Sequence, residues 1–133
     1  MNNKLKSHFI NLYLVALSDG NFEEKELETI LKIGEEKGLS KTEFEQIILN
    51  PTSVEFHYPE TFIEKIEFLF DFTRVIMADE KIDDEEKFTF LKFCKKFGFE
   101  ENESNELFNW LKDLVDKKIN HADLQNEISK LLN

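Results

Sequence analysis

Apolar residues recur along the first part of the chain at the three- and four-residue spacing that is typical of amphipathic helices. A first helix is marked by Leu5, Phe9, Leu12 and Ala16. It should end near residues 18–20, because Gly20 suits the left-handed conformation that often stops a helix. The next helix carries on one face Leu27, Ile30, Leu31 and Gly34. We expect it to end at Gly38.

A capping box opens the third predicted helix. In the stretch SKTE (Ser40–Glu43), a serine and a glutamate stand three residues apart, so that each side chain can bond the other's backbone N–H. Its inward residues should be Phe44, Ile47 and Ile48. Both prolines of the chain lie in NPTSVEFHYPE (Asn50–Glu60), which predicts a long connection.

Residues 62–78 are apolar on almost every face, a pattern that would also permit a pair of strands. Two features favour a central buried helix instead. The stretch lacks a turn signal over its whole length, and charged residues are interspersed in it. These charged residues are Glu64, Lys65, Glu67 and Asp71.

The pattern after this segment predicts three more helices. Residues 83–97 repeat the second helix and precede Gly98. A long helix follows, marked by Phe108, Leu111, Leu114 and Val115. The stretch NHAD (Asn120–Asp123) caps a final helix, whose inward residues are Leu124, Ile128 and Leu131. The whole pattern predicts an all-α fold of about seven helices.

The second half of the chain repeats the first at an offset of sixty residues. The phrase ALSDGNFEEKE (Ala16–Glu26) returns as IMADEKIDDEE (Ile76–Glu86). Identical pairs at this offset include Val15/Val75, Asp19/Asp79, Glu26/Glu86, Thr29/Thr89, Leu31/Leu91 and Gly38/Gly98. We therefore predict two pseudo-symmetric three-helix repeats, about 4–49 and 60–118, joined by a linker at about 50–59 and followed by a C-terminal helix at about 120–132. At 133 residues, all of this fits a single domain.

The core should rest on aromatic packing, because the chain contains fourteen phenylalanines. Phe90 and Phe93 in particular continue an apolar stripe that Phe97 extends. We expect both to be core residues, and the second and fifth helices to occupy equivalent positions in the two repeats.

A formal net charge of −11 narrows the choice of partners. It argues against nucleic acid, whose phosphates need a basic face, and equally against an anionic membrane surface. It is compatible with cations, with a basic partner, or with an acidic surface that serves only solubility. The apolar run Phe9–Leu17 is too short and too interrupted to span a membrane, so we expect no direct membrane insertion.

The residue types that carry catalysis are sparse. Cys94 is the single cysteine and replaces Gly34 of the first repeat, which indicates a small buried residue rather than a nucleophile. The histidines His8, His57 and His121 lack the spacing of metal ligands. The chain has no glycine-rich phosphate loop, no nucleophile elbow and no HExxH motif. We therefore expect a cytoplasmic protein that is not an enzyme, and no certain cofactor.

The repeated acidic phrase resembles half of a calcium-binding EF-hand loop. With Asp19 as the fifth loop position, the first and third would be Val15 and Leu17, which cannot bind an ion. A structural interpretation is simpler, because Asp83 and Glu86 can cap a helix start, and Glu23 with Glu26 can do so more weakly.

The capping interpretation does not fully explain the position of two glutamates. Glu86 stands in line with Phe90 and Phe93, so it begins the apolar stripe of its helix, and Glu26 likewise stands in line with Ile30. A carboxylate on the inward side of a helix is costly without hydrogen bonds or a cation. Both interpretations therefore remain open at this point.

The duplicated phrase, each time between an apolar helix and an amphipathic one, resembles the motif of the tellurite-resistance TerB-like family. That family includes the N-terminal domain of DjlA-type membrane co-chaperones. The resemblance spans the first helix to about the sixth. It implies an all-α fold of around seven helices and an acidic cluster for a divalent metal. Carried over by position, the metal residues would be Asp19, Glu26, Asp79 and Glu86.

We predict that the two acidic turns form one electronegative patch. The first turn contributes Asp19, Glu23 and Glu26, and the second contributes Asp79, Asp83 and Glu86. Hard carboxylate oxygens would select weakly bound Ca²⁺ or Mg²⁺. The leading expectation is thus a non-catalytic TerB-like module in a stress- or envelope-associated protein assembly. The alternatives are an interaction domain whose acids only cap helices and, more distantly, a hydrolase with an acidic site.

Overall fold

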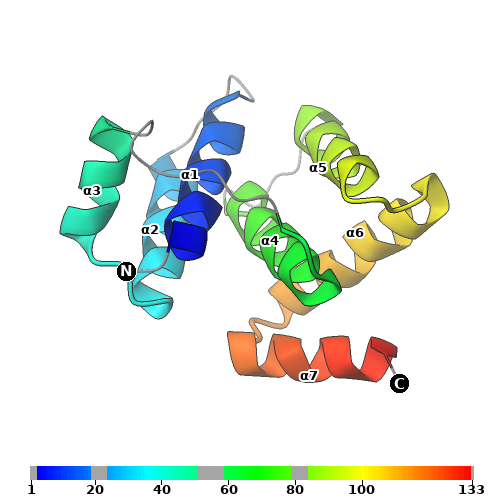
Figure 1. Ribbon diagram of the computed structural model, residues 1–133. Coiled ribbons are helices and arrows are strands. Elements are labelled where there is room, and N and C mark those ends of the chain that lie inside the picture. Colours follow the sequence, from blue (N-terminus) through cyan, green and yellow to red (C-terminus); the bar gives the residue numbers. More distant parts are fainter. Residues whose placement is uncertain (1–2, 19–23, 51–58, 79–83, 133) are drawn as a thin grey trace. The chain divides into compact units, whose positions relative to one another are not determined.

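The computed structural model describes residues 3–18, 24–50, 59–78 and 84–132, and its regular structure there is entirely helical (Figure 1). The helices are α1 (Asn3–Ser18), α2 (Glu24–Glu36), α3 (Lys41–Leu49), α4 (Phe62–Ile76), α5 (Asp84–Lys96), α6 (Glu101–Asp116) and α7 (His121–Leu132). The all-α prediction with about seven helices is confirmed. Among the described residues, no helix combines the length and the apolar character that crossing a bilayer requires.

Contacts group the chain into two compact units, which are Met1–Tyr58 with Val75–Ile82, and Pro59–Arg74 with Asp83–Asn133. In the first unit, α2 packs against both α1 and α3. Its core residues come from all three helices and include Phe9, Leu12, Ile30, Ile33, Phe44 and Ile47. The rings of Tyr13 and Phe44 are nearly perpendicular, with their centroids 6.3 Å apart.

The second unit is built around a cluster of six phenylalanines. Neighbouring rings lie 4.9–6.4 Å apart, mostly edge to face, an arrangement that adds about 0.5–1.5 kcal/mol per pair beyond area burial. The cluster consists of Phe68, Phe72, Phe90, Phe93, Phe97 and Phe108. It joins α4, α5 and α6 and confirms that aromatic packing forms this core.

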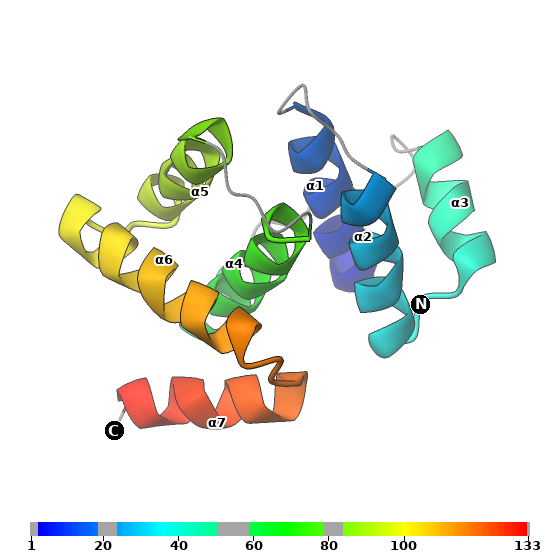
Figure 2. The same ribbon diagram turned by 180° about the vertical axis from the view of Figure 1, so that it is seen from behind.

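The C-terminal helix α7 follows α6 after a short turn and runs below it in both views (Figure 2). Asn120 caps α7, since its Oδ1 accepts a hydrogen bond from the Asp123 amide at 2.8 Å. Leu124 and Ile128 are buried, as predicted. The side-chain amide of Gln125 donates a hydrogen bond to the carboxylate of Glu67 at 3.4 Å, which links α7 to α4.

Helices α2 and α5 are locally equivalent. Each contains thirteen residues, and their ends correspond at the sixty-residue offset. Gly38 and Gly98 follow them with positive φ angles of 91° and 93°, the left-handed conformation that favours glycine. The backbone N–H that follows each glycine closes the helix end. Leu39 donates to the carbonyl of Gly34, and Phe99 donates to the carbonyl of Cys94.

The repeat also has equivalent side-chain environments where it is described. Leu31 and Leu91 are both half-buried, and the hydroxyls of Thr29 and Thr89 each donate to the carbonyl four residues earlier. Helices α2 and α5 thus share their bounds, their C-terminal turn and these local environments, whereas the equivalent placement of the two helices in the two repeats stays a prediction. Asp19 and Asp79 lie outside the described residues.

Phe93 and Leu131 were expected in the core but are only partly buried or exposed. Phe93 is half-buried, because it packs on Phe68 from one side while the ammonium of Lys96 lies 5.7 Å from its ring. Leu131 is 54% exposed, since the last turn of α7 extends past the packed surface that ends at Ile128.

The buried face of α2 is also turned relative to the predicted one. Ile30, Ile33 and Gly34 are buried together with Glu26. Leu27 and Leu31, which were expected on the same inward face, are only half-buried. The α3 capping box is as predicted, with the Glu43 amide bonded to the Ser40 hydroxyl at 3.1 Å.

Candidate functional site

Two of the six predicted metal residues are described by the structure, and both are buried. Glu26 is 2% exposed and Glu86 is 4% exposed. The other four, Asp19, Glu23, Asp79 and Asp83, lie outside the described residues. Within the described ranges, no group of three or more histidine, cysteine or acidic side chains lies close enough together to hold a metal ion.

Glu26 and Glu86 occupy the third position of their helices, and that position is glutamate in five of the described helices, including α4 with Glu64. In α3 and α6 it is Glu43 and Glu103, whose carboxylates accept hydrogen bonds from the N-cap amides of Ser40 and Glu100 at 3.3 and 3.0 Å. Glu43 is half-buried and Glu103 is exposed. A glutamate at this position can therefore cap its helix while it remains accessible to solvent.

The burial of Glu26 and Glu86 is thus more than helix capping requires. It follows from the helical spacing, since each glutamate precedes the buried residue four positions on, Ile30 or Phe90. A carboxylate in this setting needs polar or cationic compensation, which the helix N-terminus supplies in part. Glu26 and Glu86 thus have the same helical position and nearly the same burial in the two units.

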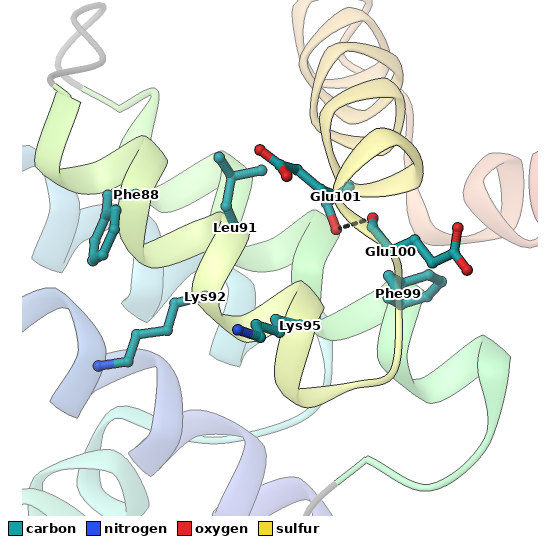
Figure 3. A pocket seen from close by; sticks show the side chains of 8 residues that line it. Phe88, Leu91, Lys92, Lys95, Phe99, Glu100 and Glu101 are labelled. Atoms are coloured by element: carbon teal, nitrogen blue, oxygen red, sulfur yellow. Dashed lines mark hydrogen bonds between the residues drawn. The ribbon is translucent and has the colours of Figure 1, made fainter.

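A second feature is a groove between α5 and the start of α6, with a volume of about 690 Å³ (Figure 3). Helix α5 lines it with Phe88, Leu91, Lys92 and Lys95. The turn and the first residues of α6 add Phe99, Glu100, Glu101 and Ser104. We refer to these eight residues as the second-half groove.

The first unit has a smaller pocket at the equivalent place, with a volume of about 210 Å³. Six of its lining positions correspond to those of the second-half groove at the sixty-residue offset. They are Leu31, Glu35, Leu39, Ser40, Lys41 and Phe44. The repeat therefore provides an internal comparison for the same local geometry.

The two pockets differ because of substitutions between the repeats. Phe44 is 3% exposed and lies in the first pocket, whereas its counterpart Ser104 leaves that volume open and bonds the Glu100 carbonyl at 2.8 Å. The counterpart of Glu28 is Phe88, which is 68% exposed. The second-half groove is consequently larger and gains an exposed aromatic wall.

Cys94 lies beside this groove, fully buried and close to Ser104. Burial raises the pKa of its thiol from about 9 to about 11, although a hydrogen bond with the Ser104 side chain acts in the opposite direction. At neutral pH the thiol is therefore protonated. This agrees with the prediction of a small buried residue and makes Cys94 a poor nucleophile.

We expect the Cys94 thiol to react with a thiol reagent at pH 8 at least about a hundredfold more slowly in the folded protein than in denaturant. Because the pKa is raised in the folded state, the unfolded chain loses the thiol proton first as the pH rises. Any stability that wild type holds over Cys94→Ala should therefore fall between about pH 9 and 11. Rapid labelling of folded protein at pH 8 would contradict the assignment.

The chain matches no family model, no curated protein and no solved structure with which it was compared. The likeness to the TerB-like motif therefore depends on the residues of the repeated phrase alone.

Sequence reasoning did not identify the second-half groove, nor the full burial of Asp71 in α4. A signal for the groove was nevertheless present in the register of the repeat. Pairs such as Phe44/Ser104 and Glu35/Lys95 change size or charge at positions where the two halves otherwise correspond. For Asp71 the surrounding apolar run gave only a weak indication.

Proposed function

We propose that this chain is a non-catalytic, TerB-like helical module that acts in a stress- or envelope-associated protein assembly. Its two acidic corners, at the starts of α2 and α5, bind a divalent cation weakly. The observation that carries the proposal is the matched burial of Glu26 and Glu86, at 2% and 4% exposure. The resemblance of the repeated phrase to the TerB-like motif supports the kind of module and its setting.

The non-catalytic assignment is supported by the state of the most reactive side chain. Cys94 is the single thiol of the chain, and burial holds its pKa at about 11. Calcium and magnesium are the cations that fit, because glutamate and aspartate offer hard oxygen ligands. Since the phrase lacks the first two ligands of an EF-hand loop, we expect a dissociation constant on the order of 10⁻⁴–10⁻³ M.

The second candidate is an interaction domain whose acids serve only as caps. It is favoured by Glu43 and Glu103, which cap α3 and α6 from the same helical position. The two candidates differ in what they expect of a neutral replacement. A cation-binding glutamate loses its ligand on conversion to glutamine, whereas a capping glutamate retains an acceptor oxygen.

A Ca²⁺ and Mg²⁺ titration followed by NMR separates them. In wild type, millimolar cation should shift the amides of the first turns of α2 and α5. Glu26→Gln should abolish the response at α2 alone, and Glu86→Gln should abolish it at α5 alone. The matched controls are Glu24→Gln and Glu85→Gln, which alter exposed carboxylates in the same helical turns and should retain the response.

Two results would reject cation binding. One is the absence of any shift in wild type at millimolar cation. The other is an unchanged response in Glu26→Gln and Glu86→Gln. If wild type shows no cation response and these variants lose at most the small helix-dipole stabilisation, because glutamine still caps the helix, the capping role is the correct one.

A further inference from the structure

We propose that the second-half groove is a docking site for an amphipathic helix of a partner protein, about three turns long. The helix places an apolar face against Phe88, Leu91 and Phe99 and an acidic edge against Lys92 and Lys95. This inference rests on the part of the proposed function in which the chain acts in a protein assembly. It does not depend on the cation.

The lining residues of the groove follow a helical stripe. Phe88, Leu91, Lys92 and Lys95 recur at the three- and four-residue spacing that places them on one side of α5 (Figure 3). At 1.5 Å per residue, the stripe runs roughly 10 Å along α5 before Phe99 continues it. A second helix laid along such a stripe buries residues at i, i+3, i+4 and i+7, which is the usual helix-in-groove contact.

The apolar surface is larger than the groove itself. The Phe99 ring lies 6.2 Å from that of Phe62, which is 36% exposed at the start of α4. Ile63, the next residue, is 44% exposed. Phe62 therefore extends the apolar lining of the groove, which includes Phe88 at 68% exposure, and exposed apolar surface of this kind marks interaction sites.

The charges that line the groove favour a partner helix with an acidic edge. Lys92 and Lys95 are exposed on the α5 side, within a chain whose net charge is −11. Glu100 and Glu101 lie on the α6 side and disfavour acidic groups there, so the acidic edge of the partner must face α5. A second copy of this chain fits less well, because two copies with the same large negative charge repel each other.

The pocket of the first unit lacks several of the residues that define the second-half groove. There, Glu35 replaces Lys95, Lys41 replaces Glu101 and Phe44 replaces Ser104. The charges at positions 35 and 41 are reversed, Lys32 keeps the charge of Lys92, and the pocket holds only about 210 Å³, so the same partner helix fits the first half less well. The substitutions that distinguish the repeats are therefore the ones that create the docking site.

The test uses two labelled helical peptides of about twelve residues with identical leucines at i, i+3, i+4 and i+7. One carries glutamates along one edge, and the other carries lysines at the same positions. Fluorescence anisotropy in EDTA, which removes divalent cations, should show saturable binding of the glutamate peptide with Kd below about 1 mM. The lysine peptide should bind at least about threefold more weakly.

The variants transplant first-half residues into the second half. Phe88→Glu should weaken the glutamate peptide at least about tenfold, and Lys95→Glu should weaken it about 3- to 10-fold. Ser104→Phe should abolish binding by filling the groove. Phe88 and Lys95 are exposed, so their variants should fold. They therefore test the proposal even if Ser104→Phe does not fold.

The matched control is Lys32→Glu, which makes the same charge reversal at the α2 counterpart of Lys92 and should leave Kd unchanged. Failure of the glutamate peptide to bind, equal binding of both peptides, or an equal effect of Lys32→Glu would each overturn the proposal. Binding of a small amphiphile such as dodecanoate without binding of either peptide would also overturn it. None of these results bears on the cation titration, which uses separate residues.

Discussion

Phe90→Ala is expected to lower the free energy of unfolding by about 3–5 kcal/mol. Phe90 is fully buried, and its ring lies 4.9 Å from that of Phe108 and 6.4 Å from that of Phe72. Truncation removes the apolar contacts of the ring and leaves a cavity between α4, α5 and α6. Surrounding aromatic rings are stiff, so we expect little collapse of this cavity.

Urea unfolding followed by the fluorescence of Trp110 measures the effect, because this single tryptophan lies in α6 of the same unit. Phe88→Ala is the control on the same helix and should change the stability by less than about 0.5 kcal/mol, since Phe88 is largely exposed. Phe93→Ala should fall between the two. A loss below about 1 kcal/mol for Phe90→Ala would show that α5 packs with another face.

Ile30→Ala should cost about 2–5 kcal/mol in the first unit. Ile30 is the counterpart of Phe90 at the sixty-residue offset and is likewise fully buried. The expected loss is smaller than for Phe90, because the deleted side chain has less apolar surface. The equivalent positions should thus rank among the most sensitive of their units.

Native-state hydrogen exchange of the α2 amides reports this loss, since it measures the opening free energy of individual helices. Ile30→Val should cost only about 0.5–1.5 kcal/mol, and the exposed neighbour Lys32→Ala should be nearly neutral. If Ile30→Ala and Lys32→Ala gave equal protection factors in α2, the assignment of the buried face would be wrong.

The helices and their ends could be predicted from the sequence because their causes are local. The Ser40–Glu43 capping box and the Asn120 cap form between residues three apart. Gly38 and Gly98 stop α2 and α5 because only glycine adopts their φ angles of 91° and 93° at low cost. The sixty-residue register then made the two helices equivalent without any knowledge of packing.

The depth of burial was less predictable, because it depends on what packs against each helix. Periodicity placed Phe90 and Phe93 on one stripe, but neighbouring rings enclose the first and only half-cover the second. Leu131 continues its stripe into the last turn of α7, where 54% of it stays exposed. The same uncertainty applied to Glu26 and Glu86, whose alignment suggested an inward position and whose burial required the fold.

By itself, the sequence determined an all-α chain, the bounds of its helices and a repeat whose acidic phrase starts α2 and α5. Only the tertiary structure decided that two third-position glutamates are buried while Glu43 and Glu103 remain accessible to solvent. It also produced the second-half groove, which needs side chains from α5 and α6 together. Helix formation depends on contacts three or four residues apart, whereas burial and grooves depend on residues that only folding brings together.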